Sequence, residues 1–271
     1  KAVFFSQPFY MIRSVLYLAV WTVLALVLYR NSVAQDGDGD VTAFRRTQWW
    51  SAPGLVVLMV TVTMAAVDWV MSLDHHWYST IFGVYVFSGG GLALMAAVTK
   101  AALFLRSQGM LKKSIHLEHY HDLGKWLFAL TVWWAYIAFS QYMLIWYADI
   151  PEETLFFKHR LEGTWTWVSA ALLVAHFIVP FLLLISRGAK RALPVLWFAS
   201  LWILVVHFID LHWLVMPSVH PHGFHIHWMD FATLLAVGSV FAFVFWSRLK
   251  SHAMIPTGDL RLAEALSHHN I

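Results

Sequence analysis

The sequence predicts an all-α, polytopic bundle of membrane-spanning helices. Hydrophobic residues make up 60% of the 271 residues and charged residues only 12%, which leaves too little polar surface for a water-soluble domain of this length. The apolar residues gather in segments of about 20 residues or more, the length that crosses about 30 Å of hydrocarbon. Because unpaired backbone amides are costly in lipid and no β-barrel alternation is visible, these segments are expected to be helices.

Seven predicted spans follow one another along the chain and are connected by short polar turns. The spans cover residues 10–29, 52–71, 81–105, 125–148, 164–186, 194–216 and 229–249. We expect residues 1–271 to form one transmembrane helical domain. Since no signal peptide or initiator methionine precedes the first span, we expect the sequence to begin partway through a longer protein.

The distribution of lysine and arginine predicts the orientation of the bundle. Of the 18 basic residues, 13 lie on the side that holds the C-terminus, four lie on the opposite side, and Lys100 lies within a span. The positive-inside rule therefore places the C-terminus in the cytoplasm. It places the two histidine-rich stretches, residues 74–78 and 218–230, outside.

Charge and cysteine content exclude several classes of function. The net charge is +3, but the basic residues lie beside apolar segments, where lipid head groups explain them, and no nucleic-acid partner is expected. The chain has no cysteine. Disulfides, thiolate ligation of iron-sulfur clusters, c-type haem attachment and cysteine-ligated copper are therefore excluded as chemistry of this chain.

The 16 histidines suggest a metal or haem site, but their context argues against both. The second histidine-rich stretch has the alternate spacing of imidazole ligands to copper or zinc, in His220, His222, His225 and His227. No cysteine or carboxylate triad completes a ligand set, so a solvated or partner-facing loop is favoured. A pair of b-type haems would need histidines on facing helices, and only His176 and His207 lie well inside the spans.

Ionisable residues inside a span cost about 2.5–3.5 kcal/mol each on translocon scales, so each is a candidate for function. The candidates are Asp68, Lys100, His176, His207 and Asp210, with Ser140 and Gln141 as neutral polar neighbours. His207 and Asp210 lie three residues apart and therefore share a helix face, as a proton relay or as a structural pair. His176 precedes Pro180 by four residues and is expected to bond backbone freed by the proline. Lys100 can extend to the inner surface.

Four sequence motifs resemble the ActF subunits of alternative complex III. They are DWVMSLDHHWYSTIFG at residues 68–83, HDLG at 121–124 followed by WAYIAFSQY at 134–142, DLHWLVMP at 210–217, and DLRLAEAL at 259–266. The motifs occur in the same order as in that family and span most of residues 45–266. The resemblance implies a polysulfide-reductase-type (NrfD-like) subunit of ten spanning helices, of which this chain would hold the last seven.

The resemblance also implies a setting and partners. Such a complex lies in the bacterial cytoplasmic membrane, oxidises menaquinol, and passes electrons to a periplasmic carrier or a terminal oxidase. The expected partners are an ActC-like paralogue, periplasmic iron-sulfur and multihaem cytochrome c subunits, and lipids. The iron-sulfur clusters and haem c belong to those subunits, and menaquinone is the one cofactor that this chain is a candidate to bind.

The distribution of polar residues predicts a proton half-channel at the outer side of the bundle. Its predicted members are Asp68, Asp74, His75, His176, His207, Asp210 and His212, with Tyr85 and Gln141 as neutral steps and Lys100 and Thr99 at the start of an inner half. Alternatively, the chain acts only as scaffold. A quinone-binding catalytic subunit, with Asp68 or His207 at a quinone oxygen, and a stand-alone secondary transporter also remain open.

Overall fold

The computed structural model describes residues 4, 6–38, 41–74, 76–112, 114–221 and 223–269, and these residues form helices joined by turns, without strands. Seven helical segments are long and apolar enough to cross a membrane. They are Gln7–Gly37, Val41–Leu73, Phe82–Ser107, Leu117–Ala148, Trp165–Leu184, Leu193–Ser218 and Trp228–Leu249. The predicted all-α multi-pass membrane fold is therefore confirmed.

Three helices extend well beyond the predicted spans. Helices α1 (Gln7–Asp38) and α4 (Leu117–Ala148) each contain 32 residues, and α2 (Val41–Trp69) contains 29, whereas about 20 suffice to cross the hydrocarbon. The sequence prediction that residues 30–51 form a loop is wrong for most of that segment. Hydropathy detects only the lipid-facing part of a helix, while intrahelical hydrogen bonds continue through polar residues that are good helix formers.

The chain divides into two compact units. The first unit contains Lys1–Val20, Val56–Phe224 and His269–Ile271, and the second contains Trp21–Leu55 and His225–His268. Helices α1 and α2 each contribute to both units. The prediction of one domain over the whole chain stays a prediction.

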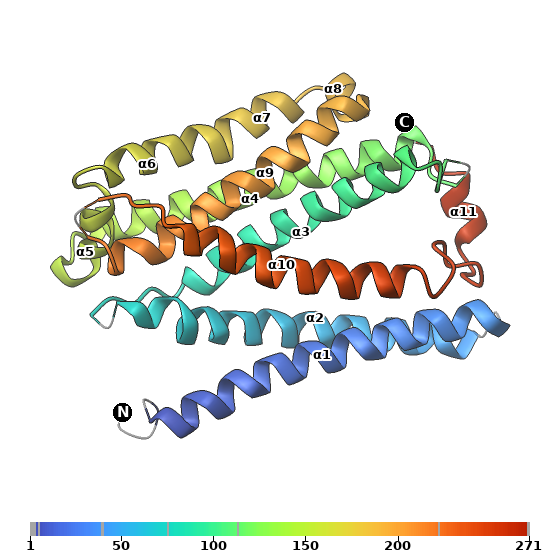
Figure 1. Cartoon of the computed structure of the whole chain (residues 1–271), viewed down its shortest axis with the longest axis horizontal. Helices are drawn as coiled ribbons and strands as arrows, with labels where there is room; N and C mark the ends of the chain where they lie inside the picture. Colours follow the sequence, from blue (N-terminus) through green and yellow to red (C-terminus); the bar gives the residue numbers. More distant parts are fainter. Residues whose placement is uncertain are drawn as a thin grey trace. The chain divides into compact units, whose positions relative to one another are not determined.

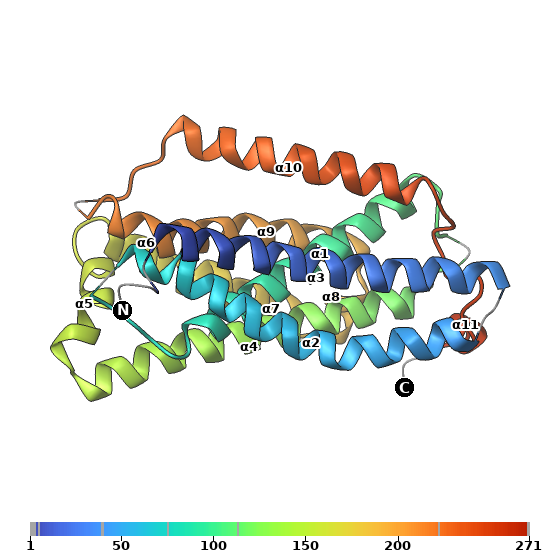
Figure 2. The same ribbon diagram turned by 90° about the horizontal axis from the view of Figure 1, so that it is seen from below.

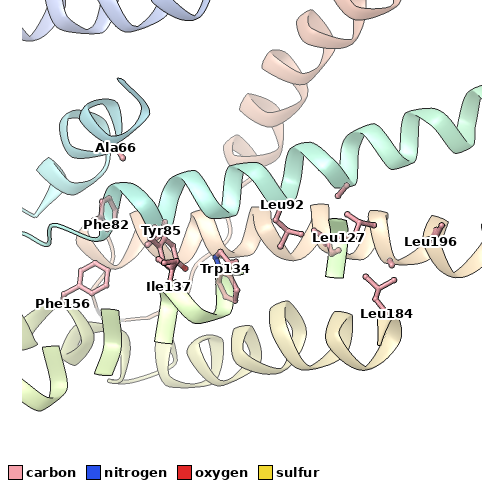
Figure 3. Close-up of a cluster of buried hydrophobic side chains, with 14 of the residues drawn as sticks. Ala66, Phe82, Tyr85, Leu92, Leu127, Trp134, Ile137, Phe156, Leu184 and Leu196 are labelled. Carbon is pink, nitrogen blue, oxygen red and sulfur yellow. The ribbon is translucent and has the colours of Figure 1, made fainter. Parts of the chain in front are cut away.

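The core of the first unit is formed where α3 (Phe82–Ser107) packs against α4 and α9 (Leu193–Val215) (Figure 1). Helices α6 (Trp165–Leu172) and α7 (Val179–Leu184) pack against α9. Buried side chains change in kind along this core: aromatic residues such as Tyr85 and Phe156 lie toward one end, and Leu127, Leu184 and Leu196 lie toward the other (Figure 3).

A π-helical turn at Leu173–Ile178 joins α6 to α7. Pro180 is the second residue after this turn. A proline has no N–H to donate, and its ring clashes with the carbonyl four residues before it, which here belongs to His176. A wider turn relieves that clash, and π-turns of this kind are frequent at functional sites. The turn therefore positions His176 in the core.

Short helices and ion pairs close the two ends of the first unit. Helix α5 (Pro151–Arg160) lies between the end of α4 and the start of α6 (Figure 2). Helix α8 (Arg187–Arg191) packs at the other end of α4. There Arg191 Nη1 lies 2.5 Å from Glu118 Oε1, so a partly exposed ion pair connects α8 to the first turn of α4.

The second unit contains α10 (Trp228–Leu249) and α11 (Leu262–Leu266). Helix α11 lies near the end of α1 and the start of α2 in both views (Figures 1 and 2). The backbone N–H of Gly258 donates to Asp36 Oδ1 at 3.1 Å. A side chain at position 258 would collide with the carbonyl of Gln35, so this contact between the C-terminal segment and α1 requires glycine.

Candidate functional site

A buried carboxylate near the end of α9 is the centre of the candidate site. The side chain of Asp210 is only 1% exposed. Its Oδ1 accepts a hydrogen bond of 2.5 Å from the hydroxyl of Tyr85 on α3, a residue 125 positions away in the sequence. A buried carboxyl group without hydrogen-bond partners would be strongly unfavourable, and this short bond supplies one.

Two histidines approach the other oxygen of the same carboxylate. His176 Nδ1 lies 3.9 Å from Asp210 Oδ2, and His207 Nδ1 lies 3.7 Å from it. Both distances exceed the usual range of a direct hydrogen bond, and neither Nδ1 has another hydrogen-bond partner in the described part of the chain. A shift of less than about 1 Å would let either protonated imidazole donate to Oδ2. The geometry therefore provides one acceptor and two alternative donors.

The sequence correctly pairs His207 with Asp210, but its expectation for His176 is wrong. Neither ring nitrogen of His176 is hydrogen-bonded to backbone or to any other described group, although the ring is fully buried. The ring instead packs against Trp134 of α4, with the two centroids 3.8 Å apart. The π-turn accommodates the proline without help from the histidine side chain.

Aromatic and glycine residues shape the walls of this cluster, which we call the Asp210 cluster (Tyr85, His176, His207 and Asp210). Trp134 contacts both His176 and Tyr85, and Figure 3 shows the side chains of Trp134 and Tyr85 close together in the core. A Cβ atom at Gly89 would lie 2.8 Å from Cε1 of His207. Glycine at this position therefore lets the His207 imidazole lie directly against α3.

The Asp210 cluster can hold and exchange a proton. An imidazole nitrogen and a carboxylate oxygen can both carry a proton, and the arrangement is electrically neutral when the carboxylate is ionised and one extra proton occupies a histidine. The second histidine then offers an alternative position for that proton. This chemistry needs no metal, and no group of three potential ligand side chains able to hold a metal ion occurs among the described residues.

Asp68 belongs to a separate polar group. Arg13 donates to both carboxylate oxygens of Asp68, from Nε at 2.7 Å and from Nη2 at 2.9 Å, and the hydroxyl of Tyr17 donates to Oδ2 at 2.8 Å. The carboxylate is only 5% exposed. The sequence counts Arg13 only among the four basic residues on the side opposite the C-terminus, because nothing local reveals a partner 55 residues away.

Lys100 also lies apart from the Asp210 cluster. It is 15 residues beyond Tyr85 on α3, a separation of about 22 Å along the helix axis. Its Nζ lies 3.0 Å from the centroid of the Trp197 ring and donates to the Trp197 carbonyl at 3.3 Å. Thr99 donates to the Met95 carbonyl. Between the Asp210 cluster and Lys100, the three core helices carry fully buried aliphatic side chains, namely Leu92, Leu127 and Ile203.

The remaining predicted site residues occupy different surroundings. Gln141 is buried on α4, about 10 Å along the axis from Trp134, and its Oε1 has no hydrogen-bond partner among the described residues. Asp74 accepts a hydrogen bond from the backbone N–H of His76, and His212 packs against Trp165 and Phe224. His75 and His222 lie outside the described residues.

Arg160 is a buried charge that sequence reasoning missed. The sequence counts it with the loop charges, whereas the side chain at the end of α5 is only 2% exposed. Its guanidinium donates to the carbonyls of Phe156, Trp213 and Leu214. The Pro-Glu-Glu run at the start of α5 signals a helix start, but only tertiary packing decides which basic residue of that helix becomes buried.

No protein-family model matches this chain, and no curated protein is similar to it.

Proposed function

We propose that this protein is an integral membrane subunit of a respiratory quinol-oxidising complex of the alternative complex III type, and that its Asp210 cluster binds and releases protons. The observation that carries the proposal is the convergence of Tyr85, His176 and His207 on one buried carboxylate. Ionisable groups within a spanning helix are costly to bury and mark proton or ion pathways in many membrane proteins.

The cluster has the components that proton exchange requires. The side chain of His207 is 12% exposed, whereas those of His176 and Asp210 are almost fully buried, so His207 is the member through which a proton would enter the cluster. A proton entering at His207 could pass to Asp210 Oδ2 and from there to His176. Tyr85 would hold the carboxylate in place while the proton moves.

The two alternatives receive less support from the geometry. A quinone oxygen at Asp68 would compete with three hydrogen bonds from Arg13 and Tyr17. A secondary transporter would favour helices broken near the middle of the membrane, whereas α3, α4 and α9 are continuous through the core. We therefore favour a proton-conducting and scaffold subunit.

The proposed assembly supplies the redox chemistry from other chains. Menaquinol would be oxidised beside an ActC-like subunit, and iron-sulfur and haem c subunits on the outer face would take the electrons. In this arrangement the protein lies in the bacterial cytoplasmic membrane with its C-terminus in the cytoplasm, as the distribution of basic residues predicts. The released protons are those for which the Asp210 cluster offers a path.

The complex and the proton role are tested by two experiments. Native purification from membranes, with haem staining and identification of co-migrating chains, should recover haem c and iron-sulfur subunits; a protein that migrates alone contradicts the proposed assembly. In vesicles containing the purified complex, Asp210→Asn should slow quinol-driven proton release without loss of assembly. Asp149→Asn is the matched control, since Asp149 is exposed and its left-handed backbone suits asparagine. Equal proton yield from both variants rules out the proton role.

A further inference from the structure

We infer that Arg160 is a positioning residue whose fixed positive charge promotes release of the proton from the Asp210 cluster. The inference rests on the proposed function and assigns a role to a residue on a different helix, outside the predicted spans. It is carried by three observations: where Arg160 is anchored, how firmly it is held, and which charges lie around it.

Arg160 is anchored to the last turn of the helix that carries Asp210. Its Nη2 donates to the Leu214 carbonyl at 2.7 Å and its Nε donates to the Trp213 carbonyl at 3.2 Å. Leu214 lies four residues beyond Asp210, an axial rise of about 6 Å. Cations stabilise the exposed carbonyls at the end of a helix, so the guanidinium both caps α9 and adds a positive charge near the carboxylate.

Surrounding groups leave the guanidinium little freedom to move. It lies 3.4 Å from the centroid of the Phe156 ring, and Phe156 in turn stacks on Trp77 at 3.9 Å. The Arg160 carbonyl accepts a hydrogen bond from Ser169, whose hydroxyl oxygen accepts another from the indole N–H of Trp213. Both the backbone and the side chain of Arg160 are therefore fixed relative to α9.

The charge of Arg160 is not neutralised by a neighbouring carboxylate. Its hydrogen bonds go to three carbonyl oxygens, and none of the ion pairs among the described residues includes it. Burial lowers the pKa of Arg160 to about 9, and Asp74 and Tyr85 oppose that shift. Because this pKa of about 9 is still well above neutral pH, the guanidinium is charged under physiological conditions.

Two titratable groups from outside its own helix act on the charge of Arg160. Asp74, just before α3, is the acidic residue whose charge acts on it most strongly, and Tyr85 on α3 connects it to the Asp210 cluster. Lys158 and His159 are the other basic residues on its own helix, and Lys158 is exposed. Arg160 is thus held at the end of the helix that carries Asp210 and interacts with Tyr85, so its positive charge disfavours a proton remaining on the Asp210 cluster.

The test measures how proton release by the whole complex in vesicles depends on pH. A unit charge about 10 Å away, in a medium of effective dielectric constant about 20, shifts an ionisation midpoint by about 1 pH unit. Arg160→Gln should therefore move the midpoint of proton release upward by about 1 pH unit. Arg160→Lys should keep the native midpoint, because it keeps the charge. Lys158→Gln is the matched control and should also keep it.

The outcomes separate this inference from the proposed function. If Asp210→Asn leaves proton release unchanged, the proposed function fails. If Asp210→Asn abolishes proton release but Arg160→Gln has the same midpoint of proton release as Lys158→Gln, only the role of Arg160 is overturned. A purely structural role would make Arg160→Lys and Arg160→Gln lose assembly together, without a shift in midpoint.

A second variant decides the question if Arg160→Gln does not assemble. Asp74→Asn removes the negative charge that acts on Arg160, so the net positive field at the Asp210 cluster grows. The midpoint of proton release should then move in the opposite direction, to lower pH. An unchanged midpoint in Asp74→Asn would overturn the inference.

Discussion

The ion pair between Arg13 and Asp68 gives a prediction whose size follows from the structure. Arg13 donates twice to Asp68, at 2.7 and 2.9 Å, and the Asp68 carboxylate is only 5% exposed. Removing one partner leaves a buried charge without its counter-ion, which costs about 3–5 kcal/mol. Arg13→Met and Asp68→Leu should each lower the free energy of unfolding by about that amount. Because both changes together leave no buried charge, the double variant should cost much less than the sum of the two single variants.

The assay is unfolding by increasing mole fraction of dodecyl sulfate in mixed micelles, followed by far-ultraviolet circular dichroism. Arg46→Met is the matched control, because Arg46 is exposed on α2 and its loss should change the free energy of unfolding by less than about 0.5 kcal/mol. Strictly additive single variants, or a cost below about 1 kcal/mol for Arg13→Met, would refute the argument that the pair is coupled and buried.

Three further predictions concern the first unit. Gly89→Ala should displace the His207 ring and lower stability by about 1–3 kcal/mol, because the added methyl would lie 2.8 Å from that ring; a histidine NMR spectrum identical to the native one would contradict this. Tyr85→Phe removes the hydrogen bond to the buried carboxylate and should cost about 1.5–3 kcal/mol in the same unfolding assay, so native stability would disprove that bond. Glu118→Gln weakens the partly exposed pair with Arg191 and should cost only about 0.5–1 kcal/mol; a loss above about 3 kcal/mol would show that the pair is effectively buried.

The spans could be predicted because lipid imposes a strict rule on composition and length, and each predicted span matches an observed helix. The ends of the helices could not be predicted, because hydropathy does not detect the polar helical turns that extend α1 and α4. The pairing of His207 with Asp210 follows from local helix geometry. Tyr85 lies 125 residues from its carboxylate partner, so their contact depends on how the helices pack and has no local signal in the sequence.

The burial of basic residues also could not be predicted from local sequence. Arg13 and Arg160 read as ordinary flanking charges in the sequence, because a basic residue next to an apolar segment usually faces lipid head groups. Packing determines instead that Arg13 meets the carboxylate of Asp68 and that Arg160 meets the carbonyls at the end of α9. Sequence reasoning therefore found Asp68 and Asp210 and missed the two buried basic residues, Arg13 and Arg160.

The most direct test of the proton role of the Asp210 cluster is infrared difference spectroscopy of the whole complex, recorded on addition of quinol. The Asp210 carboxyl should change protonation during turnover, so the native complex should show a carboxylic-acid band that is absent in Asp210→Asn and retained in Asp149→Asn. Identical spectra for all three proteins would mean that the buried carboxylate keeps one protonation state throughout, and that it serves only to hold the helices together.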